Sequence, residues 1–172
     1  MKAPRIMLAA GRSGSGKTMI TCGLLRALQQ MGKQPAAFKC GPDYIDPMFH
    51  RTVLGIPSKN LDTFFTGEKM TAELFMESAV NADISVMEGV MGLYDGLGGI
   101  RKEGSAYDLA TVTDTPVILV IDAHGMGRSI LPLIAGFLSY DMIHLIRGII
   151  LNRTSGAFFE TIPVSYTHLR AH

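Results

Sequence analysis

The sequence predicts an α/β protein in three layers, with helices packed against a mostly parallel sheet. Two observations lead to this prediction. Short apolar runs alternate with amphipathic stretches along the 172 residues, and a glycine-rich motif typical of phosphate binding follows the first run directly. Uninterrupted apolar runs of this length indicate strands that are buried on both faces. Their alternation with helices favours right-handed crossovers between parallel strands.

Apolar runs and glycines define the expected elements in the first half of the chain. The run at residues 6–10 ends at Gly11, and apolar residues on one helical face then continue until Gly32, a typical helix stop. The expected elements are strands at 6–10 and 35–40, a helix over 17–31, a loop over 41–47, and a helix that begins at a Thr71 cap and runs through Val80.

The same alternation continues in the second half. Ser105 and Asp108 have the spacing of a helix-start capping pair. The expected elements are strands at 84–87, 117–121 and 148–151, a glycine-rich loop over 89–104 and a helix over 130–138. Because the carboxyl ends of parallel strands meet at one edge of the sheet, we expect the ligand at the loops that follow these strands.

Composition excludes several classes of protein. With 47% hydrophobic and 18% charged residues, the chain can form a sizeable core and is not disordered throughout. A net charge of +1 argues against a strongly basic nucleic-acid binder, so we expect no nucleic-acid partner. No apolar run approaches the roughly 18 residues of a membrane span, and we expect no membrane partner. Cys22 and Cys40 cannot build a disulfide scaffold, which favours a reduced, cytoplasmic protein.

Residues 11–18 match the phosphate-loop motif G-x-x-x-x-G-K-[ST] in full, between a predicted strand and a predicted helix. Glycines allow backbone N–H groups to converge on phosphate oxygens, and the following helix adds the positive end of its dipole. Lys17 can reach the terminal phosphates of a nucleotide, and the Thr18 hydroxyl can bind Mg²⁺. The residues that we expect to bind the nucleotide here are Gly11, Ser13, Gly14, Ser15, Gly16, Lys17 and Thr18.

Charged residues follow the other predicted strands. Glu88 ends the third strand and is our first choice for holding Mg²⁺, while Asp122 after the fourth strand is either a competing ligand or a local cap. Lys39 ends the second strand and is either a surface lysine or a cation that neutralises phosphoryl charge. Three further acids, Asp43, Asp46 and Asp95, are expected to converge with Glu88 at the same edge.

Several segments occur in an order that resembles the N-terminal synthetase domain of the cobyrinic acid a,c-diamide synthase family. That family belongs to the dethiobiotin-synthetase-like class of P-loop NTPases, and the resemblance covers about residues 4–155. The most specific segments are GPDYIDP at 41–47 and EGVMGLYDG at 88–96. The others are the phosphate loop, an expected turn at 60–62, and residues 122–129 and 148–153.

The resemblance implies amidation of the a and c carboxylates of a corrin ring through an acyl phosphate, with ATP, Mg²⁺ and ammonia. The implied catalytic residues are Lys17, Lys39, Asp43, Asp46, Glu88 and Asp95. The implied metal ligands are Thr18, Asp46 and Glu88, and Tyr44 and Ile45 correspond to positions near the corrin. Asn152 resembles the position that reads the adenine edge. A homodimer is a possible assembly.

The sequence also departs from the family. We expect residues 1–155 to form an incomplete synthetase domain and residues 156–172 to be an atypical, poorly ordered tail that results from truncation. The resemblance also implies a C-terminal glutaminase domain that supplies ammonia in the family, and we expect these 172 residues not to contain it.

Three other interpretations stay open on the sequence alone. The first is a partitioning-type ATPase, although such proteins carry a lysine where this chain has Arg12. The second is a different ligase of the same class, such as dethiobiotin synthetase, or the related nickel-sirohydrochlorin a,c-diamide synthase. The third is a nucleotide-binding fragment without catalytic activity.

Overall fold

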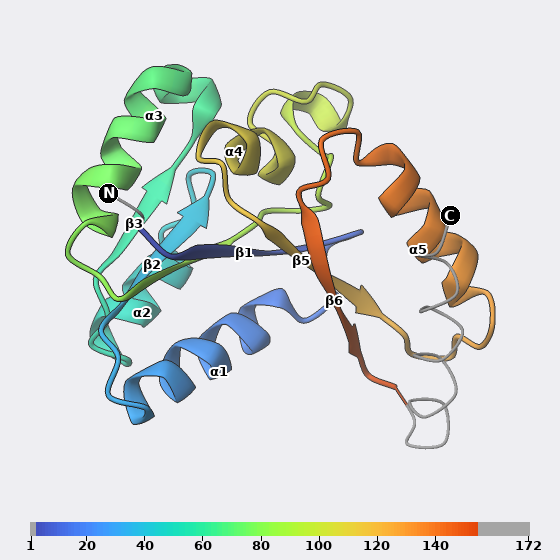
Figure 1. The fold of residues 1–172 in the computed structure, drawn as a ribbon, viewed down its shortest axis with the longest axis horizontal. Coiled ribbons are helices and arrows are strands. Elements are labelled where there is room, and N and C mark those ends of the chain that lie inside the picture. The colour runs from blue at the N-terminus through green and yellow to red at the C-terminus, as the bar shows by residue number, and fades with distance from the viewer. Residues whose placement is uncertain (1–2, 155–172) are drawn as a thin grey trace.

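A computed structural model describes residues 3–154, in which six parallel strands form one sheet in the order β3-β2-β4-β1-β5-β6 (Figure 1). The strands are β1 (Arg5–Ala10), β2 (Pro35–Cys40), β3 (Ser58–Leu61), β4 (Ile84–Glu88), β5 (Val117–Asp122) and β6 (Ile146–Asn152). The helices are α1 (Lys17–Gln30), α2 (Ile45–Thr52), α3 (Thr63–Ala79), α4 (Ala106–Val112) and α5 (Ile130–Tyr140), with a short 3₁₀ helix at Leu97–Gly99.

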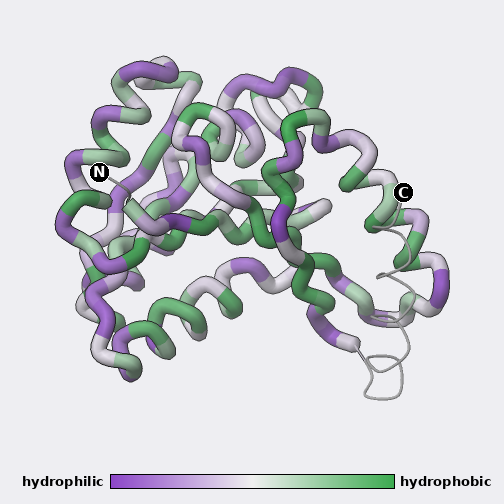
Figure 2. The backbone as a smooth tube through the Cα atoms, in the orientation of Figure 1, coloured by the Kyte–Doolittle hydropathy of each residue, from purple (hydrophilic) through white to green (hydrophobic). Residues whose placement is uncertain are grey.

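Helices cover both faces of the sheet, so the predicted three layers are confirmed. Figure 1 shows α1 on one side of the strands and α3, α4 and α5 on the other. The buried hydrophobic residues form two clusters, one on each face of the sheet, and alternate residues of β1 belong to each. Met7 and Ala9 pack on the face covered by α3, α4 and α5, whereas Leu8 and Ala10 pack with Leu25 of α1. The hydrophobic residues along the central strands in Figure 2 follow from this burial on both faces.

The register of the sheet aligns the ends of the strands that carry chemistry. Glu88 lies opposite Leu8 of β1 on one side and opposite Lys39 of β2 on the other. At the far side of β1, Asp122 lies opposite Asn152. The phosphate loop after β1 therefore has an acidic strand end on either flank.

The structure corrects three predictions in the region between β2 and β4. Residues 45–47, predicted as loop, begin α2. The helix tolerates Pro47 because it falls in the first turn, where the backbone N–H has no intrahelical partner. The predicted turn at 60–62 includes the end of β3. This edge strand is polar and lacks the apolar run by which a buried strand is predicted. The helix predicted from Thr71 begins at Thr63, where the Asp62 side chain accepts hydrogen bonds from two backbone N–H groups, and it is interrupted at Gly67.

Other predicted elements are confirmed with shifts of one or two residues at their ends. The Ser105 cap is confirmed as well, since its hydroxyl accepts a hydrogen bond from the Asp108 N–H at 3.0 Å. Within residues 3–154, no helix combines the length and the apolar character needed to cross a membrane. The predicted tail at 156–172 lies outside the described residues.

The contact between Phe38 of β2 and Phe75 of α3 provides a test of this packing. Both rings are buried and meet edge to face, with centroids 5.2 Å apart. We expect Phe38→Ala to lower the free energy of unfolding by about 3–5 kcal/mol, through lost burial and the cavity left behind. Urea denaturation measures this loss.

Phe65→Ala is the matched control, because the Phe65 ring is exposed at the start of α3. This variant should stay within about 1 kcal/mol of the wild type. Equal losses in the two variants would contradict the packing described.

Candidate active site

The phosphate loop forms the floor of a hollow of about 320 Å³ at the carboxyl edge of the sheet. Gly14 and Gly16 adopt left-handed backbone angles, with φ of 76° and 91°, which only glycine adopts at low cost. No acidic residue occupies the first turn of α1, so the N–H groups there remain available to an anion. The hollow is lined by Ser13, Gly14, Gly16, Lys17, Thr18, Lys39, Glu88, Gly89, Val90 and Met91.

Lys17 is directed across this hollow. Its Nζ donates a hydrogen bond to the Met91 carbonyl at 2.6 Å, and little of the residue is exposed. Burial lowers the pKa of Lys17, while the Glu88 carboxylate acts in the opposite direction. The lysine therefore lies between the phosphate loop and the glycine-rich loop after β4, where a phosphate bound on the loop would meet it.

Glu88 is the centre of the polar network beside the phosphate loop. The residue is fully buried, and its Oε1 accepts hydrogen bonds from the Thr18 hydroxyl at 2.6 Å and from Lys39 Nζ at 2.9 Å. Lys39 Nζ also lies 2.6 Å from an Asp46 carboxylate oxygen and 3.7 Å from one of Asp43. Of the four acids predicted to converge, Asp43, Asp46 and Glu88 meet around Lys39, whereas Asp95 bonds the Gly92 N–H instead.

Lys39 is accordingly no surface lysine. Burial alone would lower its pKa, but the Glu88 and Asp46 carboxylates outweigh that effect and raise it. A protonated Lys39 balances part of the negative charge that Glu88 and Asp46 bring into the interior, as buried charges require.

Asp43 and Asp95 lie at the edge of this network: Asp43 reaches Lys39 only at 3.7 Å, and Asp95 bonds a backbone N–H instead. An Asp43 oxygen accepts a hydrogen bond from the Ile45 N–H at 2.9 Å, and the Asn60 amide donates to the carbonyls of Gly41 and Asp43. Asp95 accepts from the Gly92 N–H at 2.9 Å and acts electrostatically on Lys17. Asn60 is a site residue that the sequence did not single out, because the contact follows from β3, an unpredicted strand.

The oxygen donors fit a magnesium ion. Thr18, Asp46 and Glu88 present hydroxyl and carboxylate oxygens, the donors that Mg²⁺ prefers. Among residues 3–154, the buried Oε2 of Glu88 has no hydrogen-bond partner, and Lys39 bridges Asp46 and Glu88 as a cation. Among the residues that the structure describes, no group of three or more His, Cys, Asp or Glu side chains is arranged to hold a metal ion by itself.

Asp122, the competing metal candidate, has other partners. Its carboxylate pairs with Arg12 at 2.7 Å and Arg153 at 3.5 Å, and it accepts from the His124 N–H at 3.2 Å. The hydrogen bond from His124 and the two arginines lower the pKa of Asp122. It is not a helix cap, because the next helix begins only at Ile130.

Exposed and buried neighbours complete the site. Tyr44 and Ile45 are 74% and 60% exposed at the start of α2, beside the acid network. His50, one turn after Asp46, is buried and shares a hydrogen bond of 3.1 Å with the Ser58 hydroxyl, which ties α2 to β3. Burial raises the pKa of Cys40 to about 12, so this thiol stays protonated and has a core role.

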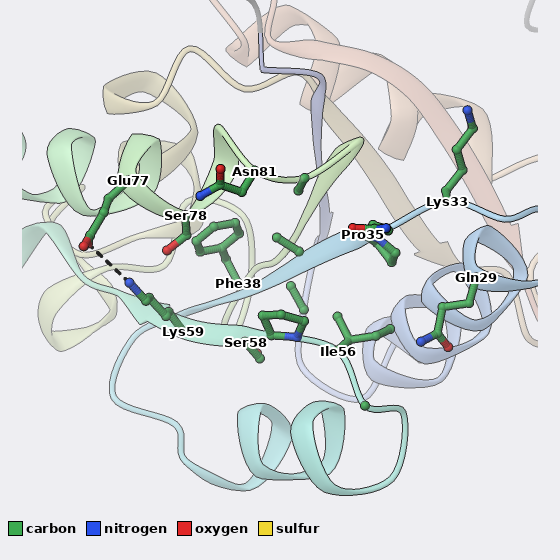
Figure 3. A pocket seen from close by; sticks show the side chains of 16 residues that line it. Gln29, Lys33, Pro35, Phe38, Ile56, Ser58, Lys59, Glu77, Ser78 and Asn81 are labelled. Atoms are coloured by element: carbon green, nitrogen blue, oxygen red, sulfur yellow. Dashed lines mark hydrogen bonds and ion pairs between the residues drawn. The ribbon is translucent and has the colours of Figure 1, made fainter.

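A second hollow, of about 540 Å³, lies away from this chemistry (Figure 3). It is formed near the amino ends of β2 and β3, and Phe38, Ile56 and Pro35 line it. At its rim, an ion pair joins Lys59 and Glu77 at 3.3 Å. The first hollow is the candidate active site, because the phosphate loop, Lys39 and Glu88 line it.

Sequence comparison places the chain among nucleotide-binding proteins. Residues 6–162 match the family described as the CobQ/CobB/MinD/ParA nucleotide binding domain. The chain is 43% identical over 166 residues to the hydrogenobyrinate a,c-diamide synthase of Mycobacterium tuberculosis, covering 94% of this chain and 36% of that protein. It is 44% identical over 156 residues to the cobyrinate a,c-diamide synthase of Thermoplasma acidophilum, covering 91% and 35%. The chain thus spans about a third of the length of these curated relatives.

Structural comparison supports the fold. The signal recognition particle receptor FtsY from Elizabethkingia anophelis matches 80% of this chain and 47% of its own, with a TM-score of 0.59 and 18% identity. A likeness at that level of identity concerns the fold alone. It agrees with the predicted P-loop NTPase fold.

Gly16 provides a test of the phosphate loop. A Cβ at this position would collide with the Asn152 amide, and the left-handed backbone adds strain for any other residue. We expect Gly16→Ala to weaken nucleotide binding at least about tenfold, measured by titration calorimetry with ATP.

Gly23→Ala is the control within α1, where an added Cβ would meet no atom within 4 Å. It should leave ATP affinity unchanged and stabilise the protein by up to about 1 kcal/mol. Undiminished ATP binding by Gly16→Ala would be incompatible with the loop geometry.

Proposed function

The chain belongs to the CobQ/CobB/MinD/ParA nucleotide-binding domain family, and from this premise we propose that it is the ATP-dependent synthetase part of a corrin a,c-diamide synthase. The observation that carries the proposal is the network of Thr18, Lys39, Asp46 and Glu88 beside the phosphate loop. Relatives named for hydrogenobyrinate and for cobyrinate match almost equally well. The proposed substrate class is therefore a corrin ring bearing carboxylates, with or without cobalt.

The first step would join a substrate carboxylate to the terminal phosphoryl group of ATP. A carboxylate oxygen forms a bond to phosphorus, the bond to ADP breaks, and an acyl phosphate results. The attacking carboxylate is already ionised at neutral pH, so this step requires no general base. It requires positioning and neutralisation of charge, which Lys17, Lys39 and the N–H groups of the phosphate loop can supply.

Magnesium would be held by Thr18, Glu88 and Asp46, with phosphate oxygens completing its ligands. When bound, it supplies further neutralisation of charge on the phosphates. Asp43 and Asp95, at the two sides of the network, are proposed to position the substrate and stabilise the intermediate. The exposed Tyr44 and Ile45 side chains would lie against the apolar part of the ring.

In the second step, ammonia attacks the acyl carbon and inorganic phosphate leaves. The nitrogen loses a proton as the amide forms, and water must be kept from the acyl phosphate. We propose that ammonia is supplied by glutamine hydrolysis outside this chain, or by free ammonium in its place.

Asn152 remains the proposed contact to the adenine edge. In the structure, its amide nitrogen donates to the Ser15 carbonyl at 2.9 Å, and its oxygen accepts from the Arg153 N–H at 3.0 Å. Reading the base would require Asn152 to share or exchange these hydrogen bonds.

Asp46→Asn tests the proposed chemistry, since it keeps the shape of the side chain and removes a charge from the Lys39 network. With ATP, Mg²⁺, ammonium and cobyrinic or hydrogenobyrinic acid, we expect the wild type to exchange oxygen between the bridging and non-bridging positions of ATP and to form amide. The variant should lose at least about 100-fold in exchange while it keeps the wild-type affinity for ATP measured without Mg²⁺.

The control is Glu77→Gln, which removes an exposed carboxylate far from the phosphate loop. It should exchange and amidate as the wild type does. Normal exchange by Asp46→Asn would disprove the assigned role. A wild type that hydrolyses ATP only with a protein partner, and ignores both corrins, would favour a partitioning-type ATPase.

A further inference from the structure

The end of β6 contacts the phosphate loop through two consecutive residues. Asn152 Nδ2 donates to the Ser15 carbonyl, and the Arg153 guanidinium donates to the carbonyl of Gly14. Arg153 has a left-handed backbone, with φ of 60°, which is costly for a residue other than glycine. Such strain persists where surrounding contacts fix the residue, and here those contacts are with the phosphate loop.

Asp122 connects this contact to the beginning of the loop. Its side chain is only 5% exposed and bonds two arginines, Arg12 within the phosphate loop and Arg153 beyond β6. Asp122 and Asn152 are opposite each other in the sheet, so both residues are held in place by the pairing of β5 with β6. The Asp122 carboxylate thus contacts the loop near its start through Arg12 and, through Arg153, at Gly14.

We propose that Asp122, Asn152 and Arg153 form a brace that holds the phosphate loop in its phosphate-binding shape. In such a loop, backbone N–H groups point at the phosphates and carbonyls face away, where they need donors from elsewhere. Asn152 and Arg153 are those donors for Ser15 and Gly14. A loop held in shape before the ligand arrives loses less conformational freedom on binding.

Arg153 and Asp122 are positioning residues in this account. The proposal concerns nucleotide binding alone. A result that disproves the brace would therefore not argue against the proposed amidation chemistry. The competing role is a direct contact of Arg153 with the nucleoside part of the ligand. The two roles differ in one respect: a brace supports every ligand that carries the phosphates, with or without a base.

The experiment titrates the wild-type chain and Arg153→Gln with ATP and with inorganic tripolyphosphate, both in the presence of Mg²⁺. We expect the variant to bind both ligands about tenfold more weakly, the loss typical of one hydrogen bond to a charged group. Arg153→Lys, which keeps the charge and a donor, should recover part of the loss for both ligands.

Arg5→Gln is the matched control, because Arg5 pairs with Asp114 at 3.3 Å near the amino end of β1. It should bind both ligands as the wild type does. Asp122→Asn is the second variant, should Arg153→Gln fold poorly, and should likewise weaken both ligands. Thermal melts establish that each variant is folded.

The double variant Asp122→Asn with Arg153→Gln should lose less affinity than the sum of the two single losses, because both changes break one brace. Weaker binding of ATP with unchanged binding of tripolyphosphate would overturn the proposal in favour of a nucleoside contact. A lower melting temperature with unchanged affinity for both ligands would overturn it as well.

Discussion

The geometry of the site depends on the partners that a buried Glu88 carboxylate requires. A charge removed from water is stable only when opposite charges or donors face it closely, and Glu88 obtains both from different elements. Thr18, in the first turn of α1, donates a hydrogen bond to Glu88. Lys39, near the end of β2, pairs with both Glu88 and Asp46 of α2. The electrostatic requirement of one side chain therefore fixes the phosphate loop, its helix and the acid network relative to each other.

The order of the strands explains why the phosphate loop can be supported on both sides. β1 lies in the interior of the sheet, with β4 on one side and β5 on the other. The β4 side places the Glu88 network beside the loop, and the β5 and β6 side places Asp122, Asn152 and Arg153 there. Glu88 and Lys39 of the first group line the hollow, where chemistry would occur. In the second group, Asn152 and Arg153 donate to carbonyls of the loop, and Asp122 pairs with Arg12 and Arg153.

Much of this arrangement could be predicted from the sequence, because buried parallel strands have an apolar pattern and their ends must meet. The convergence of Lys39, Asp46 and Glu88 follows from that rule. The pattern fails at β3, whose Lys59 and Asn60 are exposed on a sheet edge, and at α2, where Pro47 suggests a loop but fits a first helical turn. The contact between Asn152 and Ser15 joins residues 137 positions apart, and no local pattern carries such information.

The most direct test of the central claim measures how Mg²⁺ changes ATP affinity in the wild type and in Glu88→Gln. If Glu88 unites the phosphate loop and the acid network around a cation, Mg²⁺ should tighten ATP binding by the wild type at least about tenfold. Glu88→Gln should lose that gain while it binds ATP without metal as the wild type does. A gain from Mg²⁺ that survives in Glu88→Gln would contradict the account.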